Sequence, residues 1–219
     1  MHRSYILYLI IVILSSGCTT ALSEYPDVNY SQWSPSILIA TPMKGRYLKA
    51  FKECSNDENI CMDPPPQAIE YDVISQVYGK EVPSYIETAT TSHYGLESYD
   101  FINQEPELIL IGSKNGQYVL PRYHRLRLAK LSSGEYAVPI FDGDELWWLP
   151  CSIKKYIKLA QFRSSIGISV EDAYDDLKKS KYVYLNKGVY IPAYAISIKD
   201  IRSYLAIKEP LFKQFECES

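Results

Sequence analysis

The sequence has no excess of basic residues: 23 lysines and arginines stand against 26 aspartates and glutamates, a net charge of −3. A general nucleic-acid binder needs a basic face for the phosphate backbone, so this balance argues against nucleic acid as a partner. Charged residues make up 22% and aromatic residues 13%, which is too apolar for a disordered chain. The 219 residues suffice for one folded domain, or for one domain with a subdomain.

The common catalytic and cofactor-binding motifs are also missing. The chain has no phosphate-binding glycine loop, no Gly-x-Ser-x-Gly nucleophile turn and no His-Glu-x-x-His helix. Ser92 and His93 are adjacent, but neighbours on a strand point to opposite faces and would not form a catalytic pair. Asp142, Asp144 and Glu145 gather at a turn without the ligand spacing of a calcium loop. The sequence therefore indicates no metal site and no cofactor.

A ten-residue apolar run near the start, residues 5–14, follows Arg3 and precedes a group of small residues. As a helix this run would be about 15 Å long, half the hydrocarbon core of a bilayer, so it has the layout of a secretory signal rather than of a membrane span. We expect residues 1–17 to be the signal peptide. Residues 18–34, rich in Ser, Thr, Pro, Asp and Asn, are then a tether.

The end of the apolar run, Leu14-Ser15-Ser16-Gly17-Cys18, resembles the lipobox of bacterial lipoproteins, with Ser15 where that family most often has leucine. The resemblance implies that Cys18 receives a diacylglyceryl group, that cleavage falls before it, and that the new amino group is acylated, for example with palmitate. Several acyl chains anchor a protein stably where one is marginal. Because Thr19 rather than aspartate follows the cysteine, the family rule implies an outer-membrane anchor, with the protein facing the periplasm or the cell surface.

The other four cysteines are Cys54, Cys61, Cys151 and Cys217, an even number in a chain expected to reach an oxidising compartment. Four cysteines allow three connectivities, and the spacing favours Cys54–Cys61 and Cys151–Cys217. In the chain-entropy model these loops contribute about 2.5 and about 4 kcal/mol. A zinc site is the alternative, but no Cys-x-x-Cys pair occurs and no remaining histidine is near a cysteine in the sequence.

Strand signals dominate the middle of the chain. Strands are expected at residues 36–40, 46–51, 68–78, 84–93, 108–111, 117–120, 123–131 and 136–141, with Pro64-Pro65-Pro66 as a rigid connector. Asn115-Gly116 between two apolar runs is the strongest hairpin signal, and Ser132-Ser133-Gly134 predicts another turn.

The last third of the chain has a mixed pattern. Residues 152–162 show helical spacing, and Ser169–Asp172 resembles a capping box before a short helix that ends at Lys179. A hairpin is expected around Asn186-Lys187-Gly188, and a final helix from residue 198 to a stop at Pro210. The expected fold class is α+β: a β-rich small barrel or sandwich at residues 35–150, and a helix-hairpin-helix segment at residues 151–219 packed on it.

Part of the core, residues 68–141, resembles netrin-like OB-type barrels and exported proteins of no established function. The resemblance rests on Tyr71-Asp72-Val73-Ile74-Ser75-Gln76-Val77-Tyr78-Gly79-Lys80, on His93-Tyr94-Gly95, and on the paired Leu-Ile strand and hairpin that follow. In netrin-like metalloprotease inhibitors a free N-terminal cysteine binds the zinc of the target. Here that cysteine would be the lipidated Cys18, so the inhibitory activity does not carry over, and the fold itself implies no chemistry.

Two groups of residues are candidates for binding. Trp147 and Trp148 could hold a sugar face or a partner protein, although such a pair often puts one ring in the core and one at its rim. Arg122, Arg125 and Arg127 belong to the only basic cluster. On a strand, Arg125 and Arg127 share one face, which is typical of an edge strand protected by charge, or of a surface for an anionic lipid headgroup or glycan.

These observations favour a lipid-anchored cell-envelope protein that serves as a non-catalytic binding or assembly module. Its expected partners are the membrane, through lipidated Cys18, and an envelope protein or glycan. Two alternatives stay open: an envelope hydrolase that uses His93 or His124, and an inhibitor or immunity-type periplasmic protein. A buried triangle of histidine, acid and nucleophile would favour the hydrolase, whereas an exposed aromatic patch would favour the binding module.

Overall fold

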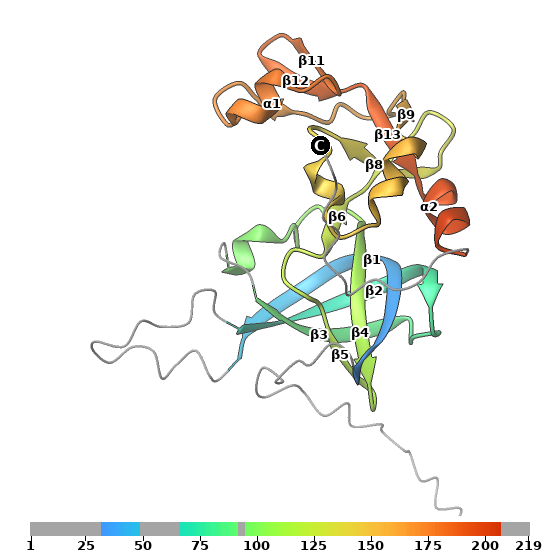
Figure 1. The fold of residues 1–219 in the computed structure, drawn as a ribbon. Coiled ribbons are helices and arrows are strands. Elements are labelled where there is room, and N and C mark those ends of the chain that lie inside the picture. Colours follow the sequence, from blue (N-terminus) through green and yellow to red (C-terminus); the bar gives the residue numbers. More distant parts are fainter. Residues whose placement is uncertain (1–31, 49–65, 92–94, 207–219) are drawn as a thin grey trace, which may run out of the picture.

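The computed structural model of the chain describes residues 32–48, 66–91 and 95–206 (Figure 1). The expected signal peptide, the lipidation site Cys18, the Cys54–Cys61 pair, His93 and Cys217 lie outside these residues. Within the three described ranges, no helix is long and apolar enough to cross a membrane.

A closed five-stranded barrel occupies the first part of the structure. Its strands are β1 (Ser34–Tyr47), β2 (Pro66–Gly79), β3 (Tyr85–Thr91), β4 (Glu107–Lys114) and β5 (Gln117–Val119). They pair in the order β1-β2-β3-β5-β4, and β4 also pairs with β1, which closes the ring. All these pairs are antiparallel except β3–β5, which is parallel. The predicted fold class, a β-rich small barrel or sandwich followed by a segment with helices and a hairpin, is confirmed, and of the two β architectures the chain forms the barrel.

The side chains of β1 and β4 are buried on both faces of these strands. Leu38 of β1 faces Ile109 of β4, and both point into the barrel core. Ile37 faces Leu110, and both point outward into a second core that the rest of the chain covers. Because successive side chains of a strand point to opposite faces, burial on both faces requires continuous apolar runs. This double burial explains why the two strands lack an alternation of polar and apolar residues.

Both predicted hairpins are confirmed. The β4–β5 turn places Asn115 at φ 52° and Gly116 at φ 78°, and the turn after residue 186 places Lys187 at φ 48° and Gly188 at φ 81°. Positive φ at both central residues is the conformation of a type I′ turn, which matches the right-handed twist of the paired strands. Glycine takes this conformation without steric cost, which explains its place in each turn.

Residues 129–206 form a second lobe, above the barrel in Figure 1. It contains a four-stranded sheet in the order β7-β8-β13-β9 and a three-stranded sheet in the order β10-β12-β11. The strands are β7 (Ala129–Lys130), β8 (Tyr136–Ile140), β9 (Lys158–Leu159), β10 (Ile168–Ser169), β11 (Val183–Asn186), β12 (Val189–Pro192) and β13 (Tyr194–Ser197). The lobe also contains the helices α1 (Asp175–Lys179) and α2 (Ile198–Leu205) and 3₁₀ helices at Asp144–Leu146 and Cys151–Tyr156. A further 3₁₀ helix, Gly95–Ser98, lies between β3 and β4 of the barrel.

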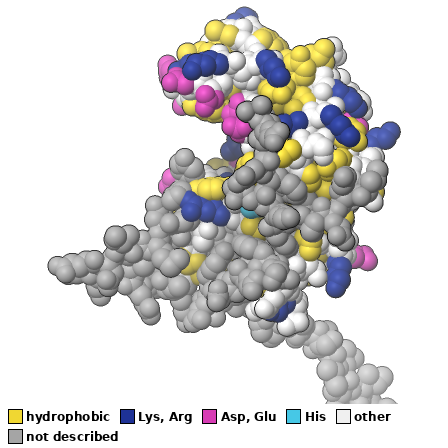
Figure 2. Space-filling model, viewed as in Figure 1, with side chains coloured by type: hydrophobic (Ala, Val, Ile, Leu, Met, Phe, Trp, Pro, Cys, Tyr) yellow, Lys and Arg dark blue, Asp and Glu magenta, His cyan; other side chains and the backbone are white. Residues whose placement is uncertain are grey.

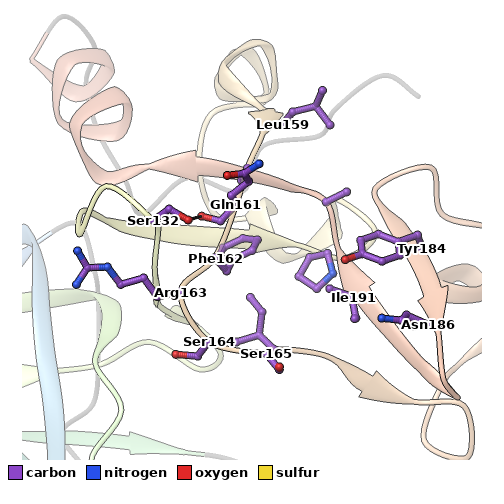
Figure 3. A pocket seen from close by; sticks show the side chains of 14 residues that line it. Ser132, Leu159, Gln161, Phe162, Arg163, Ser164, Ser165, Tyr184, Asn186 and Ile191 are labelled. Carbon is purple, nitrogen blue, oxygen red and sulfur yellow. Dashed lines mark hydrogen bonds between the residues drawn. The ribbon is translucent and has the colours of Figure 1, made fainter.

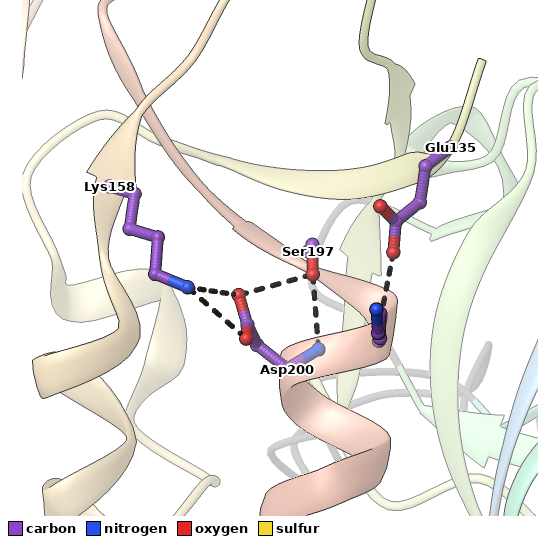
Figure 4. Close-up of polar contacts among 5 residues, drawn as sticks. Glu135, Lys158, Ser197 and Asp200 are labelled. Carbon is purple, nitrogen blue, oxygen red and sulfur yellow. Dashed lines mark hydrogen bonds and ion pairs between the residues drawn. The ribbon is translucent and has the colours of Figure 1, made fainter. Parts of the chain in front are cut away.

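Helix α2 is fixed at its first turn by polar contacts (Figure 4). The Ser197 hydroxyl accepts a hydrogen bond from the Asp200 N–H (3.0 Å), and the Asp200 carboxylate pairs with Lys158 of β9 (3.0 Å). The N–H of Lys199 donates to the carboxylate of Glu135, next to β8 (3.1 Å). Serine is a favoured N-cap because its oxygen satisfies an N–H that has no partner inside the helix. The contacts therefore attach the start of α2 to β9 and to the residue before β8, the two strands that flank β13.

The apolar face of α2 joins the lobe to the barrel. Ile201 and Leu205 are buried in the same core as Ile37 of β1 and Leu110 of β4. Val138 of β8 lies in this core as well. The barrel and the second lobe therefore bury one continuous apolar cluster between them, which we call the shared core.

Three local predictions were wrong. Residues 152–162 do not form one helix: the 3₁₀ helix Cys151–Tyr156 is followed by β9, whose backbone pairs with β13. Residues 123–131 form two short strands, β6 (Arg125–Arg127) and β7, because the chain changes partner: it pairs with β4 up to Leu128 and with β8 from Ala129. The hydroxyl of Ser169 does accept the Asp172 N–H (3.1 Å), but it caps a turn, and α1 begins only at Asp175.

Candidate functional site

An open groove of about 880 Å³ lies in the second lobe, between residues 159–166 and the β11–β12 hairpin (Figure 3). The volume is within the usual range of ligand sites. Residues from four separate parts of the chain line it: Ser132, Leu159, Ala160, Gln161, Phe162, Arg163, Ser164, Ser165, Ile166, Tyr184, Asn186, Ile191, Pro192 and Ala193.

One wall of the groove is the segment 160–163, whose backbone forms hydrogen bonds with two other segments of the chain. The Ala160 N–H donates to the carbonyl of Ala193 (2.9 Å), and the Arg163 N–H donates to the carbonyl of Lys130 (2.9 Å). The Ser132 N–H donates to the carbonyl of Gln161 (2.8 Å), beside an isolated β-bridge between Leu131 and Phe162. Long-range pairing thus fixes this wall, while its side chains stay free to face the groove.

The other wall comes from the β11–β12 hairpin. Tyr184 and Asn186 are two residues apart on β11, so they share one face, and Tyr184 lies opposite Ile191 of β12. The side chain of Tyr184 is 50% exposed. In Figure 3 Tyr184, Asn186 and Ile191 line the side of the groove opposite Gln161 and Arg163. The type I′ turn at Lys187-Gly188 sets the register that places them there.

The side chains of the groove are suited to binding rather than to acid–base catalysis. Among the described residues that line it there is no carboxylate, imidazole or thiol, and Arg163 carries the only charge. General acid–base catalysis needs a group that gains or loses a proton near neutral pH. The sequence did not reveal this site, because its first wall falls in the segment expected to be a helix. Only the hairpin that forms the second wall was predicted.

The two candidate tryptophans have different environments. Trp148 is 1% exposed and belongs to the shared core, whereas Trp147 is 38% exposed. The ring of His124 lies edge-on to Trp147, with centroids 4.7 Å apart, and is tilted against Trp148 at 5.9 Å. The structure thus gives the arrangement of one ring in the core and one at its rim.

His124 is held by its backbone neighbours. Its Nδ1 lies 2.8 Å from the carbonyl oxygen of Arg122, and because a carbonyl only accepts, Nδ1 carries the proton. Burial lowers the pKa of His124, so the ring is neutral at pH 7. Among the described residues its ring contacts are the two tryptophans, not an acid and a nucleophile. The geometry around His124 therefore does not support the hydrolase alternative.

The three candidate arginines have different environments. Arg125 pairs with Glu107 at the start of β4 (2.7 Å), donates to the Ser98 carbonyl (2.6 Å), and lies 3.9 Å above the Tyr99 ring. Arg127 on the same strand is exposed. Arg122 donates to the hydroxyl of Tyr123 (3.0 Å). Because the charge of Arg125 is already paired with Glu107, it is not available to the anionic partner that the sequence suggested.

In the acidic turn at residues 142–145, a carboxylate accepts hydrogen bonds from the backbone N–H groups of the turn itself. The carboxylate of Glu145 accepts hydrogen bonds from the N–H groups of Phe141 (2.7 Å), Asp142 (3.1 Å) and Gly143 (2.9 Å). Asp142 in turn accepts from the hydroxyl of Tyr174. Burial and the charge of Asp142 raise the pKa of Glu145. Across the described ranges, no group of three or more His, Cys, Asp or Glu is placed to hold a metal ion.

Cys151 is disulfide-bonded, and it is the only cysteine within the described residues. Its partner therefore lies outside them, and the pairing with Cys217 stays a prediction. Comparisons with protein-family models, with curated proteins and with solved structures find no match to this chain.

Proposed function

We propose that this chain is a lipid-anchored protein of the cell envelope that acts as a non-catalytic binding module, with the groove in its second lobe as the binding site. The groove is the observation that carries the proposal. It is open and lined by polar and aromatic side chains on two fixed walls, and the only charged side chain among the described residues that line it is that of Arg163.

The position at which β1 begins supports the proposed lipid anchor. Ser34, the first residue of β1, pairs opposite Ser113 near the β4–β5 turn, and Lys114 contacts Gln32 there (2.6 Å). This end of the barrel is the one farther from the second lobe in Figure 1. A lipid on Cys18 would thus attach the chain at one end of the molecule and leave the groove at the other end accessible.

The strand order supports the further proposal that the barrel is of the OB type. Such barrels have five strands in a Greek-key arrangement. The order β1-β2-β3-β5-β4, the parallel β3–β5 pair and the 3₁₀ helix Gly95–Ser98 between β3 and β4 all fit this topology. Barrels of this type serve many unrelated functions, so the topology itself adds no chemistry to the proposal.

Lipid anchoring predicts a specific defect in one variant. Cys18→Ser should abolish labelling by an alkyne fatty-acid analogue and should leave the precursor uncleaved, because the thiol is the acceptor that the proposed modification requires. The measurement is fluorescence of the clicked label on a gel, with Ser15→Leu as a control that keeps the cysteine. Normal labelling of Cys18→Ser would overturn the anchor.

Binding through the groove predicts cross-links from one wall and not from the barrel. A photo-reactive phenylalanine analogue at position 184 should give discrete products in intact cells that make the full chain. The same analogue at Tyr85 of β3 is the matched control, because these tyrosines are 50% and 51% exposed. Equal products from both positions, or none from position 184, would overturn the groove as the binding site.

A further inference from the structure

The lining of the groove combines neutral polar groups with apolar surface in a way that suits one class of ligand. The polar side chains are amides and hydroxyls, chiefly Gln161, Asn186, Ser164 and Ser165. Each amide both donates and accepts hydrogen bonds, and so does each hydroxyl. A ligand with many neighbouring hydroxyls has the same dual character, and each of its hydroxyls could be satisfied by one of these groups.

The charge of the groove points to a neutral ligand. Arg163 is the one charged residue among the described residues that line the groove, and in Figure 3 its guanidinium extends away from Tyr184 and Asn186. It lies so close to Gly134 that a Cβ at that glycine would be 2.9 Å from the Arg163 Nη2 atom. The part of the groove between Gln161 and Tyr184 therefore offers no charge to an acidic ligand.

Apolar surface lies among these polar groups. The ring of Tyr184 is half-exposed, Leu159 is exposed, and Phe162 lies between the two walls in Figure 3. Aromatic rings favour flat apolar partners, and one face of a pyranose ring presents only C–H groups. A sugar can thus pack its C–H face on Tyr184 while its hydroxyls reach the amides.

The backbone of the groove argues against an extended peptide. Peptides that bind by strand addition need free N–H and C=O groups on a strand edge. In the wall at residues 160–163, the Ala160 and Arg163 N–H groups and the Gln161 carbonyl are already paired with neighbouring segments. Tyr184 and Asn186 pair with β12 in the same way. At these positions the backbone groups are already paired, so recognition there depends on side chains.

From these observations we propose that the groove binds a neutral oligosaccharide, with Tyr184 as the stacking surface and Gln161 and Asn186 as hydrogen-bonding groups. This inference rests on the proposed function, since it names the ligand class of the same site. Its volume of about 880 Å³ can hold a short oligosaccharide rather than a single small ion.

The test is a calorimetric titration of the full chain with neutral tetrasaccharides of β-linked glucose, α-linked glucose and β-linked N-acetylglucosamine. We expect saturable binding of at least one of them. Tyr184→Ala should weaken it by about tenfold or more, and Asn186→Ala should weaken it several-fold. Tyr85→Ala is the matched control and should leave the affinity unchanged. The thermal midpoint of each variant checks that it is folded.

Two results would overturn the carbohydrate assignment: no saturation by any of the sugars up to about 10 mM, or equal losses in Tyr184→Ala and Tyr85→Ala. Cross-links from position 184 that contain protein and no sugar would also overturn it, while leaving the proposed binding function in place. Absence of any cross-link from that position would instead count against the binding function.

Discussion

Replacing Arg125 by methionine is expected to lower the free energy of unfolding by about 3–5 kcal/mol. The side chain of Arg125 is 18% exposed and that of its partner Glu107 only 4%, so the substitution leaves a buried acid without its counter-charge in the barrel. It also removes the donor to the Ser98 carbonyl and the cation above the Tyr99 ring. Urea denaturation at neutral pH measures the loss.

The double variant Arg125→Met with Glu107→Leu is the decisive control. Two apolar side chains in place of a buried ion pair are often neutral, so most of the lost stability should return. A double variant no more stable than Arg125→Met would show that Arg125 acts through packing and not through the charge of Glu107.

The same pair predicts a dependence on pH. Burial raises the pKa of Glu107 although the Arg125 charge opposes this effect. Where the pKa of an acid is higher in the folded chain than in the unfolded one, the folded chain binds the proton more readily and stability falls as pH rises. Without Arg125 the pKa of Glu107 must rise further. We therefore expect the loss of unfolding free energy in Arg125→Met to become smaller as the pH is lowered from about 7 to about 5. A loss that stays constant over this range would contradict an origin in the charge of Glu107.

The role of Arg125 illustrates the limit of strand periodicity. The alternation of Arg125 and Arg127 with Leu126 and Leu128 was interpreted correctly: the two leucines face the shared core. Alternation tells which residues share a face, but it cannot tell that part of the opposite face is also covered. Glu107, 18 residues before Arg125 in the sequence, lies opposite Arg127 in the β4–β6 ladder and pairs diagonally with Arg125.

The groove could not be predicted from the sequence for a similar reason. The hairpin at Lys187-Gly188 is a local signal, and it was predicted. The wall at residues 159–166 depends on pairing with β13 and with residues 130–132, which are remote in the sequence. The helical spacing of Ile153, Ile157 and Ala160 favoured a different local structure, and tertiary pairing overrode it. Closure of the barrel by β1–β4 and β3–β5 is equally non-local.

The second large effect is expected at Trp148. Trp148→Ala should lower the free energy of unfolding by about 3–5 kcal/mol, because removal of a large ring from a close-packed core leaves a cavity. The ring is 1% exposed and lies in the shared core with Leu110 of β4 and Ile201 of α2. Since this core belongs to both the barrel and the second lobe, the variant should unfold in one transition at a lower urea midpoint.

Trp147→Ala is the matched control, one residue away and with the same loss of atoms. Its ring is 38% exposed and contacts His124 from the rim, so we expect a loss within about 1 kcal/mol. Circular dichroism in the far ultraviolet follows both variants without depending on tryptophan fluorescence. Equal losses in the two variants would contradict the different burial of the rings. Two separate transitions in Trp148→Ala would show that the barrel and the second lobe unfold independently despite the core that they share.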